Sequence, residues 1–272
     1  MNTAPLPLDH VVILVADLEQ AIADYSALGF TVQRGGTHAD GFTHNALVGF
    51  ADGSYLELIA FLGTRPQHRW WRWAERGHTG FIDYALLPPT VGEVVTRARA
   101  AGVDYQGPID GGRTRLDGQV LRWQIGMPPT PELPFLCGDV TPRPLRVREG
   151  DVRQHGNGVS GIASITVLVD DLATAVQRHR ALLGGEPLLP ATLVAGAGLA
   201  QAVFRLGPSL LALVAPGPDA AHPLAAAWVA KLSSQGSGVI GLTLHGPASA
   251  ALPRAQTHGA AMDIQGPSPM RH

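Results

Sequence analysis

Residues 8–18 read LDHVVILVADL, an apolar run rich in β-branched side chains that ends at an aspartate. The run predicts a buried strand, because β-branched residues pack well on a pleated sheet. Asp17 predicts the start of a helix, because its carboxylate can accept hydrogen bonds from the free amides of a first helical turn. Apolar residues then recur at helical spacing and end at a glycine: Leu18, Ala21, Ile22, Tyr25, Leu28 and Gly29.

Three more strands are predicted after this helix, at residues 31–33, 45–50 and 55–61. The last two are separated by Asp52-Gly53, a dipeptide typical of a tight hairpin turn. The first sixty residues therefore predict elements in the order β-α-β-β-β.

The same order returns in the second half of the chain. Residues 162–172 read IASITVLVDDL, with Asp171 in the place that Asp17 takes in the first copy. Strands are predicted again at 202–206 and 210–215. These observations indicate an internal repeat.

Two weaker copies complete the pattern. The first consists of a strand at 81–87, a helix capped by Thr90 and strands at 120–125 and 133–137. The second is truncated and consists of a strand at 238–244, a short helix near 248–256 and a strand at 262–265.

These repeats predict an α+β fold of βαβββ modules, paired into curved mixed sheets around a cavity, with the last module truncated. Pairing is expected because one curved sheet leaves a face uncovered, which a second module can close. Residues 148–159 are polar and contain glycine, so we expect a linker there. The predicted domains are therefore residues 1–147, which carry the candidate site, and 160–272.

Composition excludes several classes of function. The formal net charge is −2, and there is no basic run of the kind that neutralises nucleic-acid phosphates. A single cysteine, Cys137, cannot form a disulfide within the chain, which favours a reducing, cytoplasmic location. We expect no signal peptide and no membrane span, because the N-terminus lacks a basic start and no apolar run is long enough.

The motifs resemble those of the glyoxalase-like branch of the vicinal-oxygen-chelate superfamily. The resemblance rests on LDHVVILVADL, on LGF at 28–30 after the helix and on GSYLELIA at 53–60. The stretch FLCGDVTPR at 135–143 also resembles a glyoxalase-like subgroup. The resemblance is close over residues 8–62 and becomes faint after 236.

The resemblance implies a divalent metal ion, with one ligand from the first strand of a module and another from its last strand. His10 and Glu57 are the matching residues of the first module. Strand alternation supports the match, because His10 shares a face with Val12, and Glu57 shares a face with Tyr55. A glutamate inside a strand is costly to bury unless it is paired or bound to a cation.

The second module departs from the family pattern. Counting back seven residues from the cap at Thr90 gives Asp83 where the resemblance implies a histidine, and Cys137 and Asp139 stand where a glutamate is expected. A site of His10, Glu57 and Asp83 would suit Mn²⁺, Fe²⁺, Zn²⁺, Ni²⁺ or Mg²⁺. Glu57 or Asp83 would then move a proton. A structural pairing of these residues without metal is the alternative.

Several residues are candidates for substrate contacts. Arginine can hold carboxylate or phosphate groups with its forked donors, and an indole can stack on a ring. The candidates are Arg113, Arg115, Arg122, Trp123 and His44. Arg113 and Arg115 could equally lie on a solvated, glycine-rich loop.

Three functions remain open. The first is a metal-dependent enzyme with isomerase, lyase or dioxygenase chemistry on a small oxygenated substrate. The second is a metal-free protein that binds or sequesters a small molecule, and the third is a non-catalytic module that assembles with a partner. A homodimer is a possible assembly, with the C-terminal half as a structural wall or dimer surface.

Overall fold

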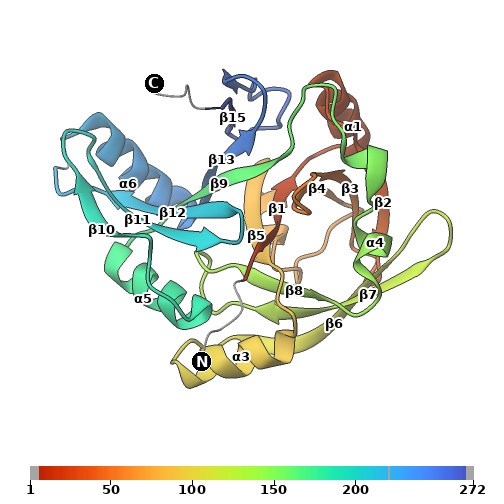
Figure 1. Ribbon diagram of the computed structural model, residues 1–272, viewed down its shortest axis with the longest axis horizontal. Coiled ribbons are helices and arrows are strands. Elements are labelled where there is room, and N and C mark those ends of the chain that lie inside the picture. The colour runs from red at the N-terminus through yellow and green to blue at the C-terminus, as the bar shows by residue number, and fades with distance from the viewer. Residues whose placement is uncertain (1–5, 220, 268–272) are drawn as a thin grey trace.

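The computed structural model describes residues 6–219 and 221–267, which form a closed barrel and an open sheet (Figure 1). This arrangement confirms the predicted α+β fold of paired βαβββ modules. Each module is described below by its elements.

The first module supplies half of the barrel. Its elements are β1 (Leu8–Leu14), α1 (Leu18–Ala27), β2 (Gln33–His38), β3 (Thr43–Gly49) and β4 (Tyr55–Phe61). Asp17 caps α1 by accepting hydrogen bonds from the amides of Glu19 and Gln20. Strands β3 and β4 form the hairpin that Asp52-Gly53 predicts. The strand expected at 31–33 begins at Gln33 and extends to His38.

The second module supplies the other half of the barrel. Its elements are β5 (Gly80–Leu86), α3 (Val91–Ala100), β6 (Gln106–Thr114), β7 (Val120–Met127) and β8 (Phe135–Asp139). A short helix, α2 (Trp71–Ala74), connects the two modules. Strand β6 was not expected, because its sequence QGPIDGGRT is rich in residues that favour turns.

Eight strands close the barrel in the order β1-β4-β3-β2-β6-β7-β8-β5. Strand β1 pairs with β4 in parallel and with β5 in antiparallel orientation, and β2 pairs with β6 to join the modules on the other side. Helices α1 and α3 lie on the outside of the barrel (Figure 1). The side chains that alternate inward along each strand therefore share one enclosed space.

A chain segment with two short helices, α4 (Arg143–Arg146) and η1 (Gly150–Arg153), leads from the barrel to the second half. The third module follows, with β9 (Gly161–Leu168), α5 (Leu172–Leu183), β10 (Leu189–Val194), β11 (Leu199–Leu206) and β12 (Ser209–Pro216). Helix α6 (Pro223–Gln235) connects it to the truncated module, which consists of β13 (Gly238–His245), β14 (Ala250–Ala251) and β15 (Met262–Gln265).

These strands form one open sheet in the order β10-β11-β12-β9-β13-β15-β14. The helix expected near 248–256 is wrong: these residues contain β14 and a turn, and Pro253 interrupts the segment. The sheet packs beside the barrel through β13 and β5, and one apolar core extends across both halves. No helix in the described part of the chain is long and apolar enough to cross a membrane.

Candidate functional site

A cavity of about 300 Å³ lies inside the barrel. Aromatic side chains form much of its wall, and these are Tyr55, Trp70, Trp123 and Phe135. Charged and polar side chains, most of them from β1, β2, β3, β4 and β6, and several aliphatic side chains form the remainder. A mostly apolar cavity with a few convergent polar groups is the usual form of a small-molecule site.

His10 and Glu57 meet in this cavity, as the strand alternation predicts. Strands β1 and β4 are parallel neighbours, and Glu57 pairs with Val12, two residues along the ladder from His10. The Nε2 atom of His10 lies 3.4 Å from an oxygen of Glu57. Both residues are buried, with 2% and 6% of their surfaces exposed.

Two further side chains hold the Glu57 carboxylate. The Nε2 atom of His38 lies 3.4 Å from Oε1 of Glu57, and the amide of Asn45 donates to the same oxygen over 2.5 Å. Burial alone would raise the pKa of Glu57, but the contacts with His10 and His38 hold it well below the usual value. Glu57 is therefore a buried anion with donors on both oxygens.

The imidazole of His10 lies between two carboxylates. Its Nδ1 atom is 2.7 Å from Oδ2 of Asp9, while its Nε2 atom faces Glu57. Burial alone would lower the pKa of His10, but Asp9 and Glu57 raise it overall. The arrangement thus favours an imidazolium that links two anions.

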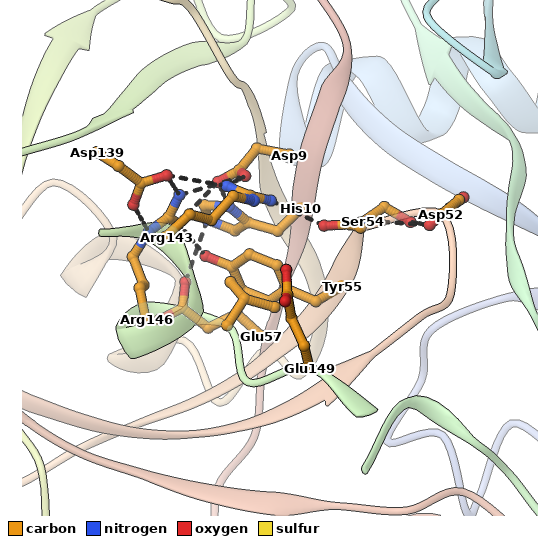
Figure 2. A network of polar contacts seen from close by, with 12 residues as sticks. Asp9, His10, Asp52, Ser54, Tyr55, Glu57, Asp139, Arg143, Arg146 and Glu149 are labelled. Atoms are coloured by element: carbon orange, nitrogen blue, oxygen red, sulfur yellow. Dashed lines mark hydrogen bonds and ion pairs between the residues drawn. The ribbon is translucent and has the colours of Figure 1, made fainter. Parts of the chain in front are cut away.

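Asp9 belongs to a larger buried ionic network (Figure 2). Arg146 donates to Asp9, Asp139 and the hydroxyl of Tyr55, and Arg143 forms ion pairs with Asp9 and Asp139. Burial alone would raise the pKa of Asp9, but Arg146, the hydrogen bond with His10 and Arg143 lower it overall. The network therefore fixes the charge and orientation of the group behind His10.

Arg113 is a buried cation of the cavity wall that lacks an acidic partner. Its side chain donates to Asn45 Oδ1 and to the carbonyl of Arg146, each over 3.0 Å, and 3% of its surface is exposed. In the described residues no carboxylate lies within 4.0 Å of its nitrogens, and its Nε atom has no hydrogen-bond partner. Burial lowers its pKa, as expected for a charge removed from water.

Asp83, the third predicted metal ligand, does not join His10 and Glu57. Its carboxylate forms an ion pair with Arg69 and accepts from the indole of Trp70 over 2.9 Å, and its side chain is absent from the cavity lining. This placement corrects the predicted arrangement: Arg69, from the segment before α2, neutralises Asp83.

A divalent metal ion does not fit the predicted set of ligands. Within residues 6–219 and 221–267, no three His, Cys, Asp or Glu side chains are arranged to hold one ion. His10 and His38 approach different oxygens of Glu57, each at 3.4 Å. A metal ion at Glu57 would have to displace contacts that already balance its charge.

The predicted substrate contacts divide into two groups. Arg113 and Trp123 line the cavity. Arg115, Arg122 and His44 do not: Arg115 pairs with Asp117, Arg122 is exposed on β7, and His44 alternates with the inward Thr43 and Asn45 on β3. The division follows from strand alternation, because successive side chains of a strand point into and out of the barrel.

The sequence interpretation missed Asp9, Asn45 and Arg146, and it considered His38 only as a loop residue that borders the cavity. Alternation places Asp9 on the face opposite His10, but the pairing of β1 with β5 is irregular between Leu8 and His10, which lets both side chains join one network. His38 and Arg113 are paired across β2 and β6, a contact between modules that no local pattern encodes. Cys137 is buried, and burial raises its pKa to about 12, so it is no thiolate nucleophile.

An eight-stranded barrel of two βαβββ modules around an inward His and Glu defines a protein of the vicinal-oxygen-chelate superfamily. The family profile described as Glyoxalase-like domain matches residues 8–183, and the chain belongs to this family. Among curated proteins, no sequence matches this chain.

Solved structures with the same fold are distant in sequence. A hypothetical protein from Staphylococcus aureus is 12% identical, with a TM-score of 0.72, over 96% of this chain and 99% of that protein. A mutant of 4-hydroxymandelate synthase from Streptomyces coelicolor is 18% identical, with a TM-score of 0.64, over 93% and 78%. A fusion of a xylose isomerase-like TIM barrel with 4-hydroxyphenylpyruvate dioxygenase is 16% identical, with a TM-score of 0.54, over 90% and 37%. At these identities the likeness shows the fold alone.

Proposed function

We propose that the barrel binds a small organic acid with the side chains of its own cavity, without a bridging divalent metal ion. The observation that carries this proposal is the unpaired, buried guanidinium of Arg113 in the cavity wall. A buried cation without an ion-pair partner is unfavourable, and a carboxylate is the partner that a guanidinium binds best.

The buried charges of the cavity support an acidic ligand, while two further acids of its lining, Asp40 and Asp110, are exposed to solvent. Glu57 is balanced by His10, and Asp83 is balanced by Arg69. Arg146 is balanced by Asp9 and Asp139. Arg113 is thus the cation that a ligand would neutralise. Trp70, Trp123 and Phe135 offer flat apolar surfaces, which favour an aromatic body for that ligand.

The names of two fold neighbours supply suitable probes. 4-Hydroxymandelate and 4-hydroxyphenylpyruvate each combine an aromatic ring with a carboxylate, the combination that this cavity favours. We propose this class of compound for the ligand, and no particular member of it.

Isothermal titration calorimetry with 4-hydroxymandelate, after treatment with EDTA, tests the proposal. We expect one site per chain, and we expect Arg113→Met to weaken binding by about tenfold or more, since a charge-assisted hydrogen bond contributes about 1.5–3 kcal/mol. Arg122→Met is the matched control, because Arg122 is exposed on the neighbouring strand. Circular dichroism of each variant checks that it is folded.

Equal binding by the two variants would contradict a role for Arg113. Absence of binding by 4-hydroxymandelate, 4-hydroxyphenylpyruvate and mandelate alike would contradict the ligand class. Either result can be read without knowing whether the protein is an enzyme.

A metal-dependent enzyme is the second candidate, and one observation favours it. His10 and His38 both direct Nε2 toward Glu57, while Asp9 and Thr43 hold their Nδ1 atoms at 2.7 and 2.8 Å. Metal-binding imidazoles commonly have such orienting partners. Elemental analysis after incubation with Mn²⁺, Fe²⁺, Zn²⁺, Ni²⁺ and Mg²⁺ distinguishes the candidates. One ion retained per chain, and lost in His10→Ala, would favour the enzyme over the metal-free site.

A further inference from the structure

A second cavity, of about 210 Å³, lies where the barrel meets the C-terminal half. Its wall comes from α2 and β5 on one side and from α6, β13 and the turn before β15 on the other. Its lining shares no residue with the lining of the barrel cavity. The two cavities are therefore separate sites.

All the ionisable side chains of this wall are basic. They are Arg72, His78, Lys231 and Arg254, and the lining contains no aspartate or glutamate. Lys231 is the only lysine of a chain whose net charge is −2. Within the described residues, Arg72, Lys231 and Arg254 form no ion pair within 4.0 Å.

These cations are close enough to affect one another. Burial lowers the pKa of Lys231, and the charge of Arg254 lowers it further. Burial also lowers the pKa of His78, the hydrogen bond with the Phe81 carbonyl opposes this shift, and the charge of Lys231 adds to it. Like charges that converge without an acid repel one another, and a bound anion would relieve this repulsion.

Two indoles accompany the basic groups. Trp73 and Trp228 line the same cavity, one from the barrel side and one from α6. The imidazole of His78 lies 4.9 Å from the ring of Trp73, and the guanidinium of Arg72 lies 4.9 Å above it. Indole faces suit a planar ring, while arginine and lysine suit an oxyanion attached to that ring.

We infer that the cavity between Trp73, Trp228, Lys231 and Arg254 is a binding site for a small aromatic oxyanion, a ring bearing a phosphate or a carboxylate. Its volume of about 210 Å³ accommodates a single ring rather than a larger cofactor. Both halves of the chain contribute to the site, so the ligand would also bridge them.

Titration calorimetry of the full chain with phenyl phosphate, at low ionic strength, tests this inference. The Arg113→Met variant, whose barrel cavity has lost its cation, isolates the second cavity. In this variant we expect one site per chain, with inorganic phosphate binding more weakly and phenol not binding. The double variant Lys231→Gln, Arg254→Gln should bind phenyl phosphate about tenfold more weakly or worse, since two charged contacts are lost. Trp228→Leu should reduce the advantage of phenyl phosphate over inorganic phosphate.

Two control variants locate the binding. Arg205→Gln removes an exposed cation of β11, distant from this lining, and should bind phenyl phosphate as the parent protein does. Arg113→Met removes the cation of the barrel cavity and should also leave this binding unchanged. Absence of binding, equal binding by the double variant and Arg205→Gln, or loss of binding in Arg113→Met would each overturn the inference.

Discussion

At the scale of single residues, the buried ionic network is organised around Asp9. This carboxylate contacts His10, Arg143 and Arg146, and Arg146 in turn contacts Asp139 and Tyr55 (Figure 2). Every charge in the network has an opposite charge beside it, which is the condition under which buried ions are tolerated. The network lies directly behind the imidazole that faces the cavity, so its loss would disturb both stability and the site.

We predict that Arg146→Met lowers the free energy of unfolding by about 3–5 kcal/mol, because it leaves the buried Asp9 and the partly buried Asp139 with one cation fewer. Arg148→Met, two residues away, should change it by less than about 0.5 kcal/mol, since 54% of that side chain is exposed and its nearest acid lies 3.9 Å away. Urea denaturation of both variants measures the difference. Similar losses in the two variants would contradict a structural role for the network.

The sequence predicts which side of a strand a side chain points to better than it predicts which residue that side chain contacts. Alternation along the first and fourth strands brings His10 and Glu57 into one cavity, as expected. It cannot predict that Arg69, from the segment before α2, neutralises Asp83, or that Asn45 connects Arg113 to Glu57. The contact of Arg113 with Asn45 depends on barrel closure, which pairs β6 with β2 of the first module, and Arg69 lies in a segment without regular strand alternation.

At the scale of elements, the two predicted helix caps differ in the structure. Asp17 accepts two backbone amides at the start of α1, whereas the Thr90 side chain makes no cap hydrogen bond at the start of α3. Both residues are suitable N-caps by type, so the sequence does not distinguish them. Strand β6 was missed, and a helix near 248–256 was wrongly expected, for one reason. In both segments the local sequence preference is weak, and pairing with neighbouring strands decides the structure.

This difference between the caps gives a prediction about the elements. Asp17→Ala should lower the free energy of unfolding by about 1 kcal/mol, because two amides at the start of α1 lose their acceptor. Thr90→Ala should cost less than half as much, because no side-chain hydrogen bond is lost. Thermal or urea denaturation of the two variants provides the comparison. Equal costs would show that the carboxylate of Asp17 contributes no more than the Thr90 side chain.

At the scale of the whole molecule, the two halves are joined by polar contacts as well as by a common core. Asp52 of the β3–β4 turn accepts the amide of Ile162 at the start of β9. Arg178 of α5 forms an ion pair with Glu132, which precedes β8. The repeat predicts both halves, but these contacts are not part of either module, so the sequence pattern could not predict how the halves pack.

His179 provides the last test of this junction. It lies fully buried on α5, where Nδ1 donates to the carbonyl of Ala175 and Nε2 lies 3.2 Å from the hydroxyl of Tyr84 on β5. Burial lowers its pKa from 6.5 to about 4. Between about pH 6.5 and pH 4, His179 therefore binds a proton more readily in the unfolded chain than in the folded protein. The free energy of unfolding should fall as the pH decreases through this range.

The loss attributable to His179 is on the order of 3 kcal/mol over that interval, because each pKa unit corresponds to about 1.4 kcal/mol. We predict that His179→Gln lowers stability at neutral pH but flattens its decline between about pH 6.5 and pH 4, since glutamine does not titrate. His245→Gln, at an exposed position on β13, should keep the slope of the parent protein. Urea denaturation across this pH range measures the slopes. A His179→Gln slope as steep as that of the parent would assign the acid sensitivity to other groups and leave the junction between the halves insensitive to pH.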